Sequence, residues 1–118
     1  MNAFGKGAGS GPGLRPIRSE DDLEAALNEP LAVLYKHSPL CGLSAVAARE
    51  VRSFLEGSPG TPVYLVDVIR ERRLARGLGE RLGIRHESPQ AIVLRDGVAI
   101  WSASHRGVTA LALRSAMA

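Results

Sequence analysis

Cys41 is the only cysteine in the 118-residue chain, and its position suits nucleophilic chemistry. An apolar run at residues 31–35 and a short polar loop at 36–40 precede it, and a segment with the apolar spacing of a helix follows. A cysteine between a strand and a helix lies at the helix N-terminus, where unpaired N–H groups and the helix dipole favour the thiolate. The sequence therefore predicts a reactive thiol, with an inert, buried cysteine as the alternative.

Ser44 completes a Cys-x-x-Ser pattern with Cys41. Residues three positions apart share one face of a helix, and a dithiol oxidoreductase would carry its second cysteine at this place. Since serine cannot form a disulfide, the chain has no second thiol to resolve a mixed disulfide at Cys41. The predicted site is monothiol.

The chain has three histidines, His37, His86 and His105, and these are further candidates for the site. Imidazoles near a thiolate can stabilise it or transfer protons. One cysteine and three histidines could also bind zinc or iron in a tetrahedral arrangement. The sequence has no C-x-x-C pair, so thiol chemistry is the preferred interpretation and no metal ligand is assigned.

Apolar periodicity, caps and turn residues predict the elements that position these side chains. The expected elements are a helix from Ser19 to before Pro30, a strand at 31–35, a helix from Cys41 to near Gly57, a strand at 63–68, a helix ending at Gly83, strands at 91–94 and 98–101, and a last helix marked by Val108, Leu111, Ala112 and Ala116. Ser19 is a good N-cap, and Asp96-Gly97 is typical of a two-residue hairpin turn.

This order, α-β-α-β-α-β-β-α, predicts a thioredoxin-like α/β domain over residues 16–118, with a mixed four-stranded sheet flanked by helices. Residues 1–15 are expected to form a disordered glycine-rich tail, because they carry too little apolar surface to offset the entropy of ordering. In this topology the third strand (91–94) starts at the edge of the sheet where Cys41 lies, and the fourth strand (98–101) ends there. Residues 86–89 and 104–106 should therefore meet His37 and the thiol on one rim.

Composition argues against several classes of protein. One cysteine cannot form an internal disulfide, no apolar run approaches the ~20 residues of a membrane span, and no secretory signal is visible, so a cytoplasmic protein is expected. The net charge of +3 is mild. Six arginines between positions 70 and 85 lack interleaved aromatic residues and are interpreted as a solvated helix face. We expect a monomer that binds neither nucleic acid nor a membrane.

Four stretches of the chain, in the right order over residues 19–115, resemble the YtxJ family of monothiol bacilliredoxins. They are Tyr35-Lys36-His37-Ser38-Pro39 with Cys41 and Ser44, Val66-Asp67-Val68-Ile69, His86-Glu87-Ser88-Pro89-Gln90, and Ser102-Ala103-Ser104-His105. The resemblance implies a thioredoxin-like fold in which Cys41 removes bacillithiol, a glucosamine–malate–cysteine thiol, from mixed disulfides on cytosolic proteins. Bacillithiol would be a co-substrate, with no permanently bound cofactor. The resemblance also implies a cis Ser88–Pro89 bond facing the thiol, whereas general statistics favour trans.

The site residues expected from topology and resemblance fall into two groups. The catalytic group is Cys41, Ser44, His37 and Pro89, and the substrate-binding group is Lys36, His86, Ser88, Gln90, Ser104, His105 and Arg106. Lys36 or a protonated histidine could assist the thiolate. Arg106 and the N-terminus of the last helix, near Gly107 and Val108, could hold the carboxylates of the small thiol.

Two residues depart from the family pattern, which usually has proline at the position of Gly42 and tryptophan at that of Arg106. Gly42 makes the motif similar to the Cys-Gly-Phe-Ser of monothiol glutaredoxins, which carry iron–sulfur clusters with glutathione. Those proteins have a Gly-Gly-x-Asp turn where this chain has Ser104-His105-Arg106-Gly107. An iron–sulfur cluster carrier, or a Cys/His metal-binding protein, is therefore the alternative function.

Overall fold

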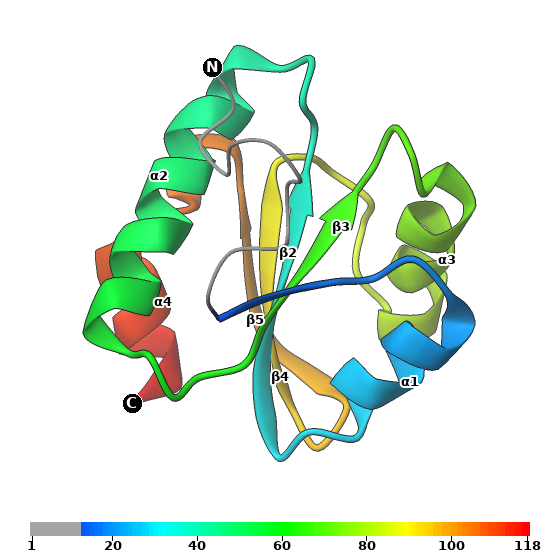
Figure 1. The fold of residues 1–118 in the computed structure, drawn as a ribbon, viewed down its shortest axis with the longest axis horizontal. Helices are drawn as coiled ribbons and strands as arrows, with labels where there is room; N and C mark the ends of the chain where they lie inside the picture. Colours follow the sequence, from blue (N-terminus) through cyan, green and yellow to red (C-terminus); the bar gives the residue numbers. More distant parts are fainter. Residues whose placement is uncertain (1–12) are drawn as a thin grey trace.

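The computed structural model describes residues 13–118. Its elements, in chain order, are β1 (Leu14–Pro16), α1 (Glu20–Leu27), β2 (Leu31–His37), α2 (Gly42–Gly57), β3 (Val63–Asp67), α3 (Arg72–Leu82), β4 (Gln90–Arg95), β5 (Val98–Ser104), a 3-10 turn η1 (His105–Gly107) and α4 (Ala110–Met117). In this part of the chain the strands form one mixed sheet in the order β1-β3-β2-β4-β5. Helices α2 and α4 cover one face of the sheet, and α1 and α3 cover the other (Figure 1).

The sheet has one strand more than the four predicted. β1 pairs in parallel with β3, placing Leu14 opposite Val63 and Pro16 opposite Leu65. Leu14 is buried in the core, so Leu14 and Arg15 belong to the domain and not to the predicted tail. A three-residue edge strand is too short to show periodicity, which explains why the sequence did not reveal it. Of the predicted tail, residues 1–12 lie outside the described residues, and Gly13 forms a turn before β1.

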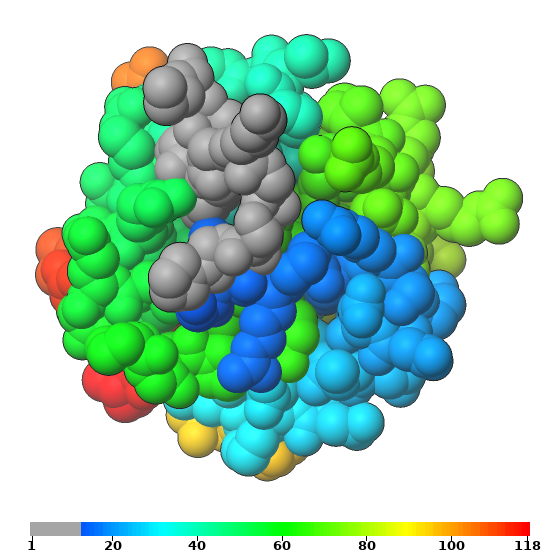
Figure 2. Space-filling model, viewed as in Figure 1, coloured from blue at the N-terminus to red at the C-terminus, as the bar shows by residue number. Residues whose placement is uncertain are grey.

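β1 is the edge strand next to β3, and apart from Leu14 its residues and the start of α1 are at least partly exposed. In the space-filling view this segment, drawn in blue, crosses between α2 and α3 (Figure 2). Ser19 caps α1 as predicted, because its side chain accepts a hydrogen bond from the amide of Asp22 at 3.1 Å. Within residues 13–118, no helix combines the length and apolar character that a membrane crossing requires.

The core has two halves, one on each face of the sheet. Val33 and Tyr35 of β2 pack in the half covered by α2 and α4, whereas Ala32 and Leu34 pack in the half next to α1 and α3. Successive side chains of a strand point to opposite faces. Lys36 therefore points to the α3 side and His37 to the α2 side.

Strand pairing fixes which residues lie at the edge where β2 ends. β2 is parallel to β3 and antiparallel to β4, and β4 is antiparallel to β5. Lys36 lies opposite Gln90, and Gln90 lies opposite Ser104. The hairpin between β4 and β5 turns at Asp96 and Gly97, both with positive φ, as the Asp-Gly pair predicted. The end of β2, the start of β4 and the end of β5 thus form one rim.

Candidate active site

Cys41 is the N-cap residue of α2, with an extended backbone at φ −107° and ψ 125°. Its amide donates to the carbonyl of Ser38 at 3.1 Å, which closes the turn that leads into the helix. The side chain is partly exposed and makes no capping hydrogen bond. The predicted position at a helix N-terminus is confirmed, and the alternative of a fully buried cysteine is wrong.

Ser44 lies one turn into α2 and is fully buried. Its amide donates to the carbonyl of Cys41 at 3.0 Å, and its hydroxyl oxygen accepts a hydrogen bond from the amide of Ser38 at 3.1 Å. Ser44 therefore fixes the loop that carries the thiol, besides occupying the position where a second cysteine would stand.

Tyr35 joins β2 to this turn and is a site residue that was not predicted from the sequence. Its buried hydroxyl donates to the carbonyl of Ser44 at 3.2 Å and lies 3.1 Å from Nδ1 of His37. Burial raises the pKa of Tyr35, the bond to Ser44 lowers it in part, and the charge of Cys41 raises it further. A tyrosine inside an apolar strand next to a histidine was the available signal, because a buried hydroxyl needs a partner.

His37 is buried on the same side of the sheet as Tyr35. Burial lowers the pKa of His37. The charge of Asp67, which lies opposite His37 on β3, raises this pKa in part. The imidazole is therefore neutral at neutral pH. We call Tyr35, His37 and Ser44 the α2-side network.

Lys36 forms a second network on the opposite face. Its ammonium donates to Oε1 of Gln90 at 2.9 Å and lies 2.7 Å from Nδ1 of His86. Burial lowers the pKa of Lys36 to about 8, and the charge of Glu87 offsets part of that effect. The side chains of Lys36 and Gln90 are both buried, and each has the other as a hydrogen-bond partner. We call Lys36, His86 and Gln90 the α3-side network.

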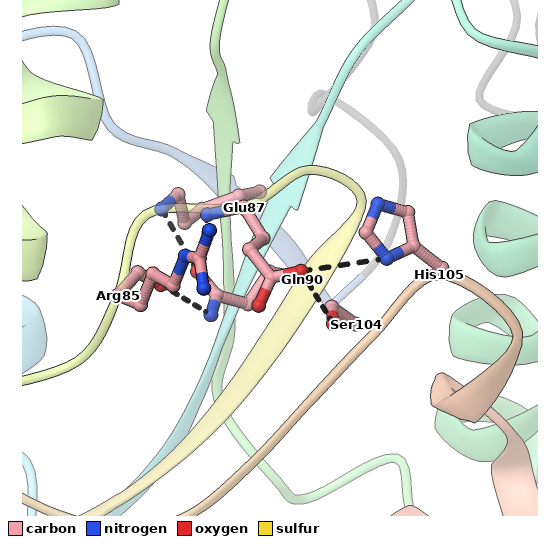
Figure 3. A network of polar contacts seen from close by, with 6 residues as sticks. Arg85, Glu87, Gln90, Ser104 and His105 are labelled. Atoms are coloured by element: carbon pink, nitrogen blue, oxygen red, sulfur yellow. Dashed lines mark hydrogen bonds and ion pairs between the residues drawn. The ribbon is translucent and has the colours of Figure 1, made fainter.

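Residues 85–89 connect α3 to β4 and include the Ser88–Pro89 bond, which is cis as the resemblance implied. Figure 3 shows how polar contacts hold this segment, which we call the 85–89 loop. Oε1 of Glu87 accepts a hydrogen bond from the hydroxyl of Ser104 at 3.1 Å and lies 3.5 Å from Nδ1 of His105. The amide of His105 donates to the carbonyl of Pro89 at 2.9 Å. The end of β5 therefore holds the loop from one side.

The three histidines lie near the same rim but have separate partners. His37 contacts Tyr35, His86 contacts Lys36, and His105 contacts Glu87. Among residues 13–118, no group of three or more histidine, cysteine, aspartate or glutamate side chains could hold a metal ion.

The predicted carboxylate site at the N-terminus of the last helix is wrong. Residues 105–107 form the 3-10 turn η1, and α4 begins only at Ala110, after the N-cap Thr109. The amide of Ala110 already donates to a carboxylate oxygen of Glu50 in α2, at 2.9 Å. A side-chain anion thus occupies the place predicted for a ligand. Arg106, in η1, remains exposed.

Comparisons with known proteins agree with this geometry. The sequence model of a family described as monothiol bacilliredoxin BrxC matches residues 15–113. Among solved structures, a candidate oxidoreductase with a thioredoxin fold is similar, with 27% identity and a TM-score of 0.82 over 87% of this chain and 92% of that one.

Two thioredoxins show the same fold at lower identity. The thioredoxin of Fasciola hepatica has 22% identity and a TM-score of 0.70, covering 86% of this chain and 94% of that one. The thioredoxin of Trypanosoma brucei brucei has 17% identity and a TM-score of 0.73, covering 90% of this chain and 88% of that one. The predicted thioredoxin-like fold is confirmed.

Proposed function

The chain belongs to the monothiol bacilliredoxin BrxC family, and we propose that its Cys41 removes bacillithiol from mixed disulfides on cytosolic proteins. The family and the fold identify a thiol–disulfide oxidoreductase. The observation that carries the proposal is a lone, partly exposed cysteine at the N-cap of α2, with Ser44 one turn later. The chain, acting as a monomer, has one thiol, that of Cys41, for disulfide exchange.

The reaction takes place in two exchanges. The Cys41 thiolate attacks the bacillithiol sulfur of the client's mixed disulfide, forming a Cys41–bacillithiol disulfide and releasing the client thiolate, which takes a proton from water. A second low-molecular-weight thiol, as thiolate, then attacks the bacillithiol sulfur, forms a small-molecule disulfide and frees Cys41. Attack on the small thiol's sulfur is required, because no second cysteine of the chain can resolve a bond to the client.

Replacing the nucleophile tests this proposal. Cys41→Ser should abolish release of bacillithiol from a thiolated model protein, as measured by the client's mass over time. Ser53→Ala is a suitable control, because Ser53 is exposed on the same helix and should leave the rate unchanged. Release by Cys41→Ser at a rate comparable to the wild type would refute the assignment.

Arg106 is the proposed contact for the carboxylates of the small thiol. It is exposed at the rim beside His105, and a guanidinium can bind a carboxylate through two hydrogen bonds. Ser88, which is half-buried in the 85–89 loop, is the proposed contact for the remainder of the ligand.

We expect Arg106→Ala to slow exchange with bacillithiol about 10-fold or more, since a charged hydrogen bond contributes roughly 1.5–3 kcal/mol. Exchange with mercaptoethanol, which has no carboxylate, should hardly change. Arg114→Ala removes an exposed arginine from α4 and controls for net charge. Equal slowing of both thiols would show that Arg106 does not recognise carboxylates.

A further inference from the structure

Lys36 is buried at the rim, yet it cannot serve the thiol directly, because its side chain lies on the α3 side of the sheet. Tyr35 and His37, on either side of it in the strand, point to the face covered by α2. The groups that Lys36 contacts are Gln90 and His86 instead. A buried cation costs free energy unless it is well paired, so its role must be sought in those contacts.

The Lys36 ammonium determines how the Gln90 amide is oriented. An ammonium can only donate hydrogen bonds, so the amide oxygen must face Lys36 and the amide nitrogen must face away. In that orientation Nε2 donates to the carbonyl of Arg85 at 3.0 Å, and Oε1 also accepts from the amide of Glu87 at 3.4 Å. By orienting the Gln90 side chain, Lys36 thus fixes two backbone groups of the 85–89 loop, the carbonyl of Arg85 and the amide of Glu87.

The same ammonium also holds His86, the second residue of that loop. Charged Lys36 requires Nδ1 of His86 to be the acceptor, so the neutral ring carries its proton on Nε2. Lys36 is fully buried, although His86 itself is exposed. The loop therefore contacts Lys36 of β2 directly at His86, and through Gln90 of β4 at Arg85 and Glu87.

We propose that Lys36 is a positioning residue: through Gln90 and His86 it holds the 85–89 loop in the conformation that receives the client's mixed disulfide, without touching thiol or substrate. This inference rests on the proposed function, because the loop is there assigned to substrate binding. Glu87, Ser104 and His105 hold the loop from the β5 side, and Lys36 holds it from the β2 side.

The test separates substrate binding from the reactivity of the thiol. Lys36→Met removes the ammonium and keeps an apolar stem of similar length. We expect KM for a bacillithiolated protein to rise about 5- to 10-fold, from the loss of hydrogen bonds to a charged group. The rate of Cys41 alkylation by iodoacetamide should stay within 2-fold of the wild type, and the loop amides should exchange hydrogen faster. Arg73→Met, an exposed charge on α3, is the matched control.

A double variant keeps the test valid if Lys36→Met does not fold. Lys36→Met with Gln90→Met replaces both polar partners, which costs less than leaving one of them unpaired. It should show the same rise in KM with unchanged alkylation. If the alkylation of Cys41 slowed as much as the thiol–disulfide exchange with the client, Lys36 would act on the thiol. If KM did not change, the loop would need no support from Lys36. Either result overturns the inference.

Failure of the proposed function would look different. If the wild-type protein released no bacillithiol, the proposed function would be wrong and the positioning role would fail with it, even if faster hydrogen exchange at residues 85–89 in Lys36→Met showed that Lys36 holds the loop. Unchanged hydrogen exchange there, with an active wild type, would contradict the positioning role alone.

Discussion

The α2-side and α3-side networks lie at the same rim and grow from consecutive residues of β2, but they differ in charge and in what they hold. The α2-side network is made of neutral groups and fixes the turn that carries Cys41. The α3-side network contains a buried ammonium and fixes the 85–89 loop. Because neighbouring side chains of a strand point to opposite faces, the end of β2 supports the turn of Cys41 with one residue and the 85–89 loop with the next.

The largest effect that would sharpen this comparison comes from Ser44 on the α2 side. Ser44→Cys should form an internal disulfide with Cys41, because residues three apart on a helix face each other. Under mild oxidant in the presence of a small thiol, the variant should lose the mass of two hydrogens, about 2 Da, as the internal disulfide forms. The wild type should instead gain the mass of the small thiol.

Ser53→Cys is the matched control for that experiment. The side chain is exposed on α2 about 18 Å along the helix axis from Cys41, too far for a disulfide. It should add small thiols without forming an internal bond. If Ser44→Cys behaved in the same way, the two positions would not be adjacent on the first turn of α2.

The next largest effect concerns the α3 side and its cation. The pKa of Lys36 is about 8 in the folded chain, below its value of 10.5 when exposed. Between those values the unfolded state binds more protons, so the free energy of unfolding should rise with pH. Relative to Lys36→Met, the wild type should gain up to about 3 kcal/mol between pH 8 and 10.5, measured by urea unfolding. If the difference in the free energy of unfolding between the wild type and Lys36→Met did not change between pH 8 and 10.5, Lys36 would not be in a desolvated site.

A smaller effect of opposite sign is expected on the α2 side. Burial raises the pKa of Tyr35 above 10, so the unfolded state loses its phenol proton first as pH rises. Relative to Tyr35→Phe, the wild type should lose stability above pH 10, by at most about 1.4 kcal/mol per pH unit. If both differences in the free energy of unfolding, against Lys36→Met and against Tyr35→Phe, changed with pH in the same direction, the two networks would not differ in charge as described.

Residues with a strong local signal were predictable from the sequence. Cys41 at the start of α2, the Ser19 cap and the Asp96-Gly97 turn each depend on interactions within a few residues, and all three are confirmed. The resemblance supplied the cis bond before Pro89, which local statistics did not favour.

Three features depended on contacts that the sequence does not display. β2 is buried on both faces, so it shows no alternation to tell which way Lys36 points, and its contacts with His86 and Gln90 were not predicted. Tyr35 was counted among the apolar residues of that strand, which hid its hydroxyl. The turn η1 delays the start of α4, and apolar spacing does not locate helix ends closely.

The central claim is that Cys41 alone takes the small thiol from the client. The most direct measurement is intact mass spectrometry of both proteins after mixing the reduced chain with a bacillithiolated client and no free thiol, with quenching by acid. We expect the chain to gain the mass of one bacillithiol as the client loses the same mass, and Cys41→Ser to gain none. A covalent complex of chain and client as the main product, or a client that loses bacillithiol while the chain's mass stays constant, would contradict it.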